Sequence, residues 1–475
     1  MSVVLEALRQ TILVADYVVL AYFFLLNSGY AILLIYSIPE MWTHYHIAED
    51  ENFRALLDSE ALPPASLLVP AYNEELTVVG STISFLTLEY PRHEVILVND
   101  GSKDQTMEVL IRDFELYEVP AAFPVTLMTQ PVRAYYRSRR YSRLLVIDKA
   151  NGGKADSLNA ALNVARFPYV VAVDADTLID PDALVRLGRP FLLGQRVAAV
   201  GGTIRVVNGS RVENGRVVDA RVSRRLLAGI QTVEYLRAFL FGRLGWNRLG
   251  GNIVISGAFG MFRREYLLAI DGYQTGNVTE DMDLVVRLHR YLCENNIPGD
   301  LPFIPDPVAW TEVPSTVKVL SRQRERWHRG LIATLWSHRD MLFDRRYRKV
   351  GMLSMPFFFF GEMLAPLVEL FGLIAVPLAA ALGIVDWELA LLFLIVAVGY
   401  GLLLSVWGVI LEAFSFRRYR HASDYLWLLV CAVVENFGYR QMTLLFRLHA
   451  FVKFARGERS WGKMTRVGFA TRPAA

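Results

Sequence analysis

Hydrophobic positions divide the chain into two membrane-like regions with a soluble-like region between them. Residues 17–36 form an uncharged stretch of 20 residues, and further apolar stretches cover residues 356–384 and 389–411. A helix of about 20 apolar residues can cross a hydrocarbon layer of about 30 Å. Between residues 64 and 350, short apolar runs alternate with amphipathic stretches. We therefore expect an N-terminal transmembrane helix, an α/β domain and a second membrane region.

The N-terminal helix is predicted to span residues 12–38. A cleaved signal peptide is the alternative, but the apolar run is too long for one and no small-x-small site closes it. The second membrane region is predicted to cover residues 351–450. Its stretch 356–384 is long enough for a short interfacial helix followed by a span.

Basic residues predict how these helices are oriented. No Lys or Arg occurs in the 66 residues 351–416, and basic side chains flank that region on both sides: Arg339, Arg345, Arg346, Arg348, Lys349, Arg417, Arg418 and Arg420. Lys and Arg are retained on the cytoplasmic side of a membrane. We therefore expect a multi-pass inner-membrane protein whose residues 40–350 face the cytoplasm.

A fourth apolar candidate, residues 425–446, carries a polar stripe. Four of its polar side chains fall on one helical face: Glu435, Asn436, Tyr439 and Arg440. They would line a polar conduit or form a helix–helix contact. A spanning helix would place the basic tail 451–475 outside, against the positive-inside trend, so we favour an interfacial or re-entrant helix. The tail is expected to contact anionic lipid head groups.

The region between the membrane stretches has the alternation of an open α/β sheet. Strands are predicted at residues 66–70, 94–98, 125–129 and 169–173. Gly152-Gly153 is expected to open a helix that runs to Val164, and two Asn-Gly pairs predict an exposed hairpin near residues 208–215. The arginine- and tyrosine-rich segment 131–143 is interpreted as an insert. The predicted α/β domain covers residues 64–350.

Composition narrows the functional classes. The 475 residues are 53% hydrophobic, and 50 Lys and Arg against 47 Asp and Glu leave a net charge of +3. This balance argues against a nucleic-acid partner. Cys293 and Cys431 are the only cysteines, so neither a disulfide framework nor a cysteine-based metal site is expected.

Three acidic sites stand at predicted strand ends or at a helix start. They are Asp100, the pair Asp174 and Asp176, and the pair Glu280 and Asp281. Open α/β sheets bind ligands at the carboxyl ends of their strands. An Asp-x-Asp pair suits Mg²⁺ or Mn²⁺, which complete their coordination with phosphate oxygens. By itself such a pair is more often an exposed turn, so its neighbours decide between the two interpretations.

Six segments around these acids occur in order along the chain. They are Leu-Val-Pro-Ala-Tyr-Asn-Glu-Glu (68–75), Val-Asn-Asp-Gly-Ser (98–102), Gly-Lys-Ala-Asp-Ser-Leu-Asn (153–159), Asp-Ala-Asp (174–176), Thr-Glu-Asp (279–281) and Gln-Arg-Glu-Arg-Trp (323–327). This set resembles the family 2 glycosyltransferases with a GT-A fold, in particular the membrane-embedded synthases of cellulose, hyaluronan, chitin oligomers and poly-β-1,6-N-acetylglucosamine. The resemblance covers residues 64–340 and implies an α/β GT-A domain with flanking transmembrane and interfacial helices.

The resemblance also implies roles for individual residues. Asp281 would be the catalytic base beside Glu280, and Asp176 with Asp174 would hold Mg²⁺ or Mn²⁺. The positions that would bind the donor and the acceptor sugar are Pro70, Tyr72, Glu74, Asp100, Lys154, Asp174, Gln323, Arg326 and Trp327.

Three of these residues have plainer alternatives. Asp281 lies in the first turn of a predicted helix that Thr279 would cap, where the helix dipole favours a carboxylate whatever its role. Lys154 would otherwise be a solvated surface lysine. Trp327 would stack on the acceptor sugar or, alternatively, anchor its helix at the membrane interface.

The expected activity is an inverting hexosyltransferase reaction. A nucleotide-activated sugar, expected to be a UDP-sugar, would extend a β-linked exopolysaccharide at the membrane, with coupling to export. Expected partners are the donor, a growing glycan or lipid acceptor, membrane lipids and an accessory export subunit. The alternative is a single transfer to a lipid acceptor. A non-catalytic nucleotide-binding subunit would be expected to lack one acidic site, and all three are present.

Overall fold

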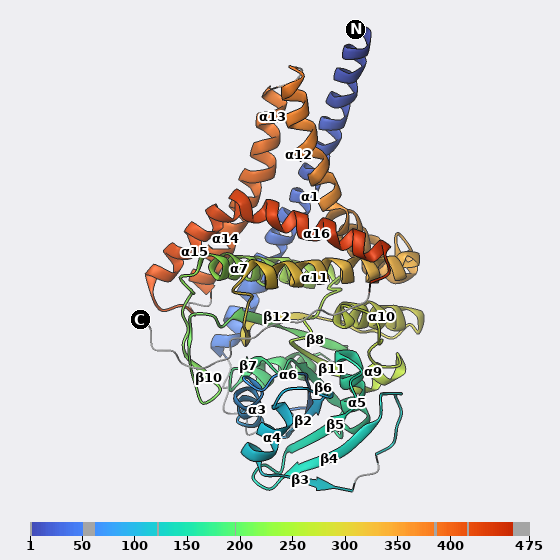
Figure 1. Cartoon of the computed structure of the whole chain (residues 1–475), viewed down its shortest axis with the longest axis vertical. Helices are drawn as coiled ribbons and strands as arrows, with labels where there is room; N and C mark the ends of the chain where they lie inside the picture. The colour runs from blue at the N-terminus through green and yellow to red at the C-terminus, as the bar shows by residue number, and fades with distance from the viewer. Residues whose placement is uncertain are drawn as a thin grey trace.

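The computed structural model describes residues 2–50, 62–120, 123–194, 196–383, 387–415 and 418–458. Its centre is a ten-stranded sheet in the order β3-β4-β5-β2-β1-β6-β11-β8-β12-β7 (Figure 1). The sheet strands are β1 (Ala65–Ala71), β2 (His93–Asn99), β3 (Leu116–Val119), β4 (Val132–Ser138), β5 (Leu144–Lys149), β6 (Tyr169–Val173), β7 (Thr177–Ile179), β8 (Ala199–Val206), β11 (Phe259–Arg263) and β12 (Phe303–Thr311).

The helices of this α/β domain pack around the sheet. They are α3 (Val78–Leu86), α4 (Thr106–Phe114), α5 (Lys154–Val164), α6 (Ala183–Leu193), α7 (Leu226–Leu236), the π-helical η1 (Arg237–Arg243), α8 (Leu244–Leu249), α9 (Arg264–Ala269), α10 (Glu280–Glu294) and α11 (Val317–Ser337). The predicted hairpin is present as β9 (Arg211–Glu213) and β10 (Arg216–Asp219), joined through Asn214 and Gly215.

The middle of the sheet is parallel. β1 pairs in parallel with β2 and β6, and β2 pairs in parallel with β5. Parallel strands bring their carboxyl ends to one edge of a sheet, so the turns that follow these four strands meet there. β11 runs antiparallel between β6 and β8 and extends the sheet toward β12.

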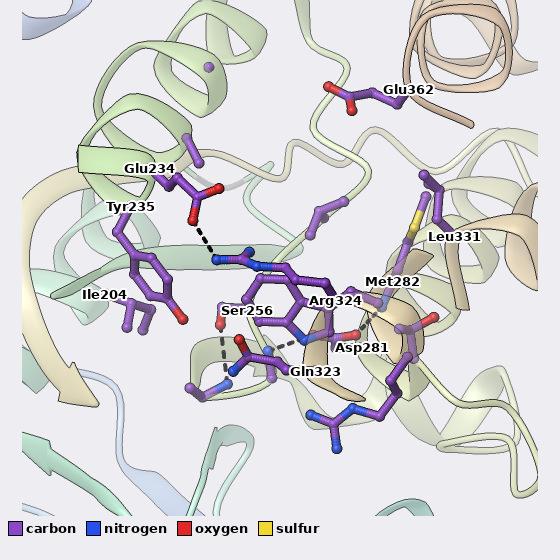
Figure 2. Close-up of a pocket in the computed structure, with 18 of the residues that line it drawn as sticks. Ile204, Glu234, Tyr235, Ser256, Asp281, Met282, Gln323, Arg324, Leu331 and Glu362 are labelled. Carbon is purple, nitrogen blue, oxygen red and sulfur yellow. Dashed lines mark hydrogen bonds and ion pairs between the residues drawn. The ribbon is translucent and has the colours of Figure 1, made fainter. Parts of the chain in front are cut away.

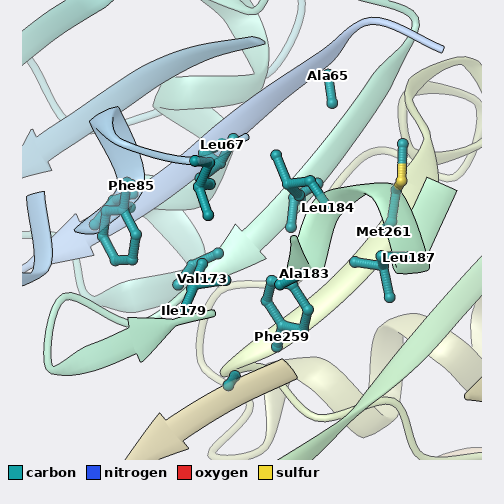
Figure 3. Packing of buried hydrophobic residues seen from close by; sticks show 14 of the residues in the cluster. Ala65, Leu67, Phe85, Val173, Ile179, Ala183, Leu184, Leu187, Phe259 and Met261 are labelled. Atoms are coloured by element: carbon teal, nitrogen blue, oxygen red, sulfur yellow. The ribbon is translucent and has the colours of Figure 1, made fainter. Parts of the chain in front are cut away.

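Both faces of the sheet are buried. Along β1, Leu67 and Val69 belong to the core on one face and Leu68 to the core on the other, as the two-residue period of a strand requires. α3 and α6 cover the first face, where Figure 3 shows Phe85 and Leu184 near Leu67. α5 and α10 contribute their apolar residues to the core of the second face. This layering is the α/β architecture that the alternation predicts.

Three of the four predicted strands are confirmed, and the one at residues 125–129 is wrong. The N–H groups of Thr126 and Leu127 donate instead to Asn163 Oδ1 on α5, at 3.1 and 2.8 Å. Segment 131–143 is no insert, because it forms β4 and leads into β5. Its polar composition reflects its place near the sheet edge, where β3 alone lies beyond it.

Two helices in the described part of the chain are long and apolar enough to cross a membrane by length and composition. They are Val14–Thr43, within α1 (Ser2–Asp50), and Val350–Ala381, which includes η4 (Val350–Ser354), η5 (Phe357–Met363) and α12 (Ala365–Ala381). The third predicted span is helical through α13 (Trp387–Leu394), η6 (Ile395–Gly399) and α14 (Tyr400–Ser415), but its apolar helix Tyr400–Ala413 is shorter. Figure 1 shows α12 and α13 extending away from the sheet together with the start of α1.

The fourth predicted segment is not one helix. α15 (Ala422–Val434) and η7 (Glu435–Tyr439) lead into α16 (Arg440–Ala455), and the backbone of Phe437 and Gly438 between them is not helical. α16 lies against α11, across the direction of α12 and α13 (Figure 1). The bend corrects the prediction of a single helix, and an interfacial placement of α16 stays a prediction. Tail residues 459–475 lie outside the described residues.

Buried ion pairs fasten the α/β domain to the C-terminal helices. Arg205 of β8 pairs with Glu412 of α14, and both side chains are almost fully buried. Arg237 of η1 lies 2.6 Å from Glu435 of η7. Removing one partner of a buried pair leaves an uncompensated charge, so these contacts fix the two regions relative to each other.

Candidate active site

One large cavity lies at the edge of the sheet where β1, β2 and β6 end. Its volume is about 1570 Å³, and its wall continues from this edge past α11 to α12 and α16. Every residue predicted to act in the site lies on the wall: Pro70, Tyr72, Glu74, Asp100, Lys154, Asp174, Asp176, Glu280, Asp281, Gln323, Arg326 and Trp327. The fold therefore brings the separate motifs into one place.

Lys154 begins α5 and lies among acidic side chains. Its Nζ is 2.6 Å from Asp174 Oδ1 and 3.0 Å from Glu280 Oε1. Burial opposes the charge on Lys154, but the carboxylates of Asp174, Glu280 and Asp281 raise its pKa above the usual value. This ammonium therefore stays charged and offsets the negative charge of its neighbours, so Lys154 is not a solvated surface lysine.

Asp281 lies in the first turn of α10, as the sequence predicts (Figure 2). Its Oδ2 accepts a hydrogen bond from the N–H of Gly257 at 2.9 Å, and its Oδ1 accepts one from the N–H of Met282 at 2.8 Å. Thr279 stands at the cap position, but its side chain makes no cap hydrogen bond. The carboxylate is thus oriented by backbone groups, and each oxygen keeps a further lone pair for a ligand.

Gly257 leaves room for this approach. A Cβ at this position would lie 2.9 Å from Lys154 Nζ and 3.2 Å from Asp281 Oδ2. Such distances are tighter than ordinary van der Waals contacts, so a larger residue would push the lysine and the carboxylate away. The absence of a side chain lets the backbone come close to both charged groups.

Asp100 is saturated by hydrogen bonds from its own chain. Lys149 Nζ lies 2.7 Å from Oδ1, and the N–H of Gly152 donates to the same oxygen at 2.9 Å. Asn151 Nδ2 and the N–H of Gly153 donate to Oδ2 at 3.0 and 2.8 Å. The Asp100 carboxylate therefore holds the loop that leads into α5 and positions the lysine at the start of that helix.

The sequence analysis missed Lys149 and Asp156, which complete this arrangement. Lys149 is fully buried, and its Nζ also lies 2.5 Å from Asp156 Oδ1. Asp156 Oδ2 accepts a hydrogen bond from the N–H of Gln130 at 3.0 Å. One signal was present: Lys149 follows the apolar run 144–147 after a single aspartate, which is an unusual place for a solvated side chain.

The turn after β1 forms another part of the cavity wall. Asn73 has a positive φ of 56°, and its N–H donates to Ser102 Oγ at 3.0 Å. The N–H of Glu74 donates to Thr106 Oγ1 at 2.9 Å. These contacts tie the turn to the segment after β2, while the ring of Tyr72 is exposed.

Asp174 and Asp176 follow β6 at the same edge. No group of three or more His, Cys, Asp and Glu side chains within the described ranges could hold a metal ion by itself. Two carboxylates nevertheless fit the protein share of a Mg²⁺ or Mn²⁺ site that phosphate oxygens and water complete. The donor set therefore suits an ion that arrives with a phosphorylated substrate.

Gln323, Arg326 and Trp327 lie on one face of α11, because their spacing of three and four residues is that of a helical turn. Gln323 is buried, and no hydrogen-bond partner is found for its Oε1 among the residues that the structure describes. An unsatisfied buried oxygen on a cavity wall is an acceptor for a ligand. The Trp327 side chain is 38% exposed.

Two further cavity residues were not predicted. Arg324 lies inside the Gln-Arg-Glu-Arg-Trp segment at a position to which the resemblance assigns no role, and Glu234 comes from α7. They form an ion pair of 2.5 Å (Figure 2). No sequence signal links them, because 90 residues separate the two positions.

The far end of the cavity is lined by polar groups of η5, α12, η7 and α16. They include Glu362, Glu369, Asn436, Arg440, Thr443 and Arg447. The helix–helix alternative for the polar stripe is borne out for two of its residues, and a conduit stays a prediction. Asn436 and Arg440 line the cavity, whereas Glu435 pairs with Arg237 and Tyr439 donates a hydrogen bond to Glu234.

Two protein-family models match the chain. Residues 66–119 match "Glycosyl transferase family 2" and residues 128–330 match "Glycosyltransferase like family 2". Together they cover the segments that carry the cavity motifs.

Curated relatives include poly-β-1,6-N-acetyl-D-glucosamine synthases of Staphylococcus. Two from Staphylococcus epidermidis are 28% and 30% identical over 302 and 299 residues, which are 62% of this chain and 63% and 62% of theirs. One from Staphylococcus aureus is 28% identical over 282 residues, 59% of this chain and 57% of its own. The chain thus matches about three fifths of the length of these relatives.

A solved structure with a similar fold is the mannosyltransferase PcManGT from Pyrobaculum calidifontis in complex with GDP-Man and Mn²⁺. It is 18% identical, with a TM-score of 0.50, and the match covers 87% of this chain and 99% of that chain. The similarity agrees with a GT-A fold.

Proposed function

Because the chain belongs to glycosyltransferase family 2, we propose that it transfers a sugar from a UDP-sugar to a growing β-linked polysaccharide, with inversion at the anomeric carbon. One observation carries the proposal. The carboxylate of Asp281, the Lys154–Asp174 pair and the indole of Trp327 line a single cavity that continues toward the membrane helices.

Asp281 is assigned as the general base. Its carboxylate takes the proton of the acceptor hydroxyl, the freed oxygen bonds to the anomeric carbon, and the bond from that carbon to the nucleoside diphosphate breaks. Gly257 N–H and Met282 N–H hold the carboxylate in one orientation. Positioned proton transfer of this kind contributes about 10²- to 10⁴-fold to a rate.

The stabilisation of the leaving diphosphate is assigned to charged groups on the same cavity wall. Asp176 and Asp174 would hold Mg²⁺ or Mn²⁺, and the bound ion would supply neutralisation of the phosphate charge. Arg326 lies on the same wall, and a guanidinium binds phosphate oxygens through paired hydrogen bonds. Lys154 adds a further cation in the same region.

The turns after β1 and β2 are assigned to the nucleotide. Pro70, Tyr72 and Glu74 line the cavity there, and the exposed ring of Tyr72 offers an aromatic surface for a base. Since the chain's own donors saturate Asp100, we assign it to hold the loop against which the nucleotide packs.

The membrane helices are assigned to product passage. The two candidate spans and the polar far end of the cavity support an inner-membrane protein whose α/β domain faces the cytoplasm and whose polymer leaves between the helices. An accessory export subunit and contacts with lipid head groups belong to the same proposal. The polysaccharide synthases among the relatives favour N-acetylglucosamine as the transferred sugar.

The test uses the full chain in detergent or lipid nanodiscs. Labelled UDP-N-acetylglucosamine, UDP-glucose and UDP-glucuronate are supplied separately with Mn²⁺, and products are separated by size on a gel. We expect a polymer from one of the three donors. A labelled product of low molecular weight alone would indicate the alternative, a single transfer to a lipid acceptor. No transfer from any donor would contradict the proposed donor class.

A matched pair of variants tests the base. Asp281→Asn is expected to lower transfer by about 10²- to 10⁴-fold while UDP binding in the presence of Mn²⁺ persists. Asp271→Asn is the control, since Asp271 is exposed and has a positive φ of 58° that asparagine also accepts. Normal turnover by Asp281→Asn would remove Asp281 from this role.

A further inference from the structure

Arg324 lies directly against the indole of Trp327. The guanidinium carbon is 4.6 Å from the centre of the ring, within the range of a cation–π interaction. The two residues are three positions apart on α11, so their side chains extend from the same face. A planar guanidinium stacks on an aromatic face, which an ammonium does not do.

The guanidinium is itself held from a second helix. Arg324 Nη2 lies 2.5 Å from Glu234 Oε2 of α7, and Figure 2 shows the arginine side chain directed at that carboxylate. Tyr439 Oη donates a hydrogen bond to the same oxygen at 2.7 Å. Only 14% of the Arg324 side chain and 21% of the Glu234 side chain are exposed, so solvent weakens this pair less than a surface pair.

From these contacts we propose that Glu234 and Arg324 form a positioning pair that fixes the Trp327 indole for the acceptor sugar. The inference rests on the proposed function, in which Trp327 carries the acceptor. Arg324 covers one part of the ring, and the exposed remainder of Trp327 faces the cavity. A restrained platform matters because a small misplacement of reacting groups lowers a rate by as much as about 10²-fold.

Contacts other than this pair also hold α11 in place. Other contacts attach that helix to α16: Glu325 Oε2 lies 3.3 Å from Lys453 Nζ, and Arg329 Nη1 donates to the carbonyl oxygen of Glu458 at 2.5 Å. A substitution at Arg324 therefore changes the indole environment while the helix remains anchored. The effect of Arg324 on the indole can therefore be tested separately from its effect on the helix.

The first test compares Arg324→Lys and Glu234→Gln with wild type, using the full chain and a soluble acceptor oligosaccharide. We expect kcat/KM for the acceptor to fall about tenfold in each variant, because a lysine keeps the charge without the planar stack and a glutamine loses the ion pair. The KM for the UDP-sugar and the slow release of UDP to water are expected to stay within about twofold. Arg322→Lys, at an exposed position of the same helix, is the matched control.

The second test is a double-mutant cycle with Trp327→Ala. If Arg324 acts through the indole, Arg324→Lys is expected to cost about tenfold in wild type and almost nothing once the indole is removed. Equal losses in both backgrounds would overturn the positioning pair. A rise in the KM for the donor in Arg324→Lys would also overturn the positioning pair.

The cycle also separates this inference from the proposed function. If Trp327→Ala itself leaves acceptor use unchanged while Asp281→Asn abolishes transfer, the acceptor role of Trp327 is wrong. If Trp327→Ala impairs acceptor use and Arg324→Lys is additive with it, the acceptor role stands and only the positioning pair fails.

Discussion

The N–H of Gly257 donates a 2.9 Å hydrogen bond to Oδ2 of Asp281 and thereby joins the segment before β11 to the start of α10. The contact is possible because the glycine has no Cβ. It orients the carboxylate that is assigned as the base, and it can be broken by adding a single methyl group.

We expect Gly257→Ala to lower kcat about tenfold or more while the protein remains folded. The added Cβ would lie 2.9 Å from Lys154 Nζ and 3.2 Å from Asp281 Oδ2, so both groups must shift. Such a displacement of a reacting group costs up to about 10²-fold in rate. Steady-state kinetics and a thermal melt would check the prediction, with Gly399→Ala as a folding comparison, because a Cβ there would have its nearest neighbour at 4.0 Å.

Lys149→Met is expected to destabilise the α/β domain by about 3–5 kcal/mol. The substitution leaves the carboxylates of Asp100 and Asp156 buried without their shared cation. Thermal unfolding followed by circular dichroism would measure the loss, with the exposed Lys103→Met as control. Adding Asp156→Asn to Lys149→Met should recover part of the stability. Unchanged melting of Lys149→Met would show that the buried charges are relieved in another way.

The protein should become less stable as the pH is lowered, because His328 is held neutral in the native state. Burial and the nearby Arg447 lower the pKa of His328 from 6.5 to about 3, so the native imidazole stays neutral. Below pH 6.5 the unfolded chain binds a proton that the native state does not, and stability is lost progressively as pH falls toward the native pKa. The loss is about 2 kcal/mol between pH 6.5 and 5, at about 1.4 kcal/mol for each pH unit.

His328→Phe isolates this effect, because a phenyl ring retains the packing against Phe451. Denaturant unfolding at several pH values should show a smaller loss of stability in the variant than in wild type. Parallel curves for the two proteins would mean that His328 does not carry the dependence.

Removal of divalent cations should abolish transfer. Chelation is expected to stop the reaction, and Mn²⁺ or Mg²⁺ to restore it, because Asp174 and Asp176 offer the two carboxylates of a site that the diphosphate completes. Calorimetry gives a readout independent of turnover. UDP binding should tighten with Mn²⁺ in wild type and respond much less in Asp176→Asn. Full activity in the presence of a strong chelator would contradict the metal assignment.

Thr443→Trp tests passage through the far end of the cavity. Thr443 lies on the cavity wall at α16, so an indole there would fill space on the proposed path of the polymer. We expect the first transfer to persist and the product to become shorter, measured by gel analysis. Thr443→Val keeps the side-chain volume and should give products of normal length. Long polymer from the tryptophan variant would place the exit elsewhere.

Local patterns were sufficient for the centre of the α/β domain. The strands at 66–70, 94–98 and 169–173 and the helix from Lys154 to Val164 are present as predicted, because each buried run has a clear period and a clear turn residue. The strand at 132–138 was missed because it carries two arginines and most of its side chains are only partly buried near a sheet edge, which weakens the apolar signal. The bend at Gly438 was missed for a related reason, since an apolar run of constant composition does not reveal a change of direction.

The motif residues were also accessible from sequence, but several of their partners were not. Lys154 and Asp281 could be identified because they belong to ordered motifs. Lys149, Glu234 and Arg324 were not assigned. Lys149 pairs with Asp100 across 49 residues, and Arg324 pairs with Glu234 across 90.

The sequence by itself determined that this chain has apolar helices flanking an α/β domain with acids at its strand ends, since hydrophobic period and turn chemistry are local properties. Only the tertiary structure decided which partners each buried cation has. Lys154 lies between Asp174 and Glu280, and Lys149 lies between Asp100 and Asp156. Arg324 lies between Glu234 and the ring of Trp327. The reason is physical. A buried charge is stable only beside its partner, and the partner is chosen by how the strands and helices pack, which no local pattern records.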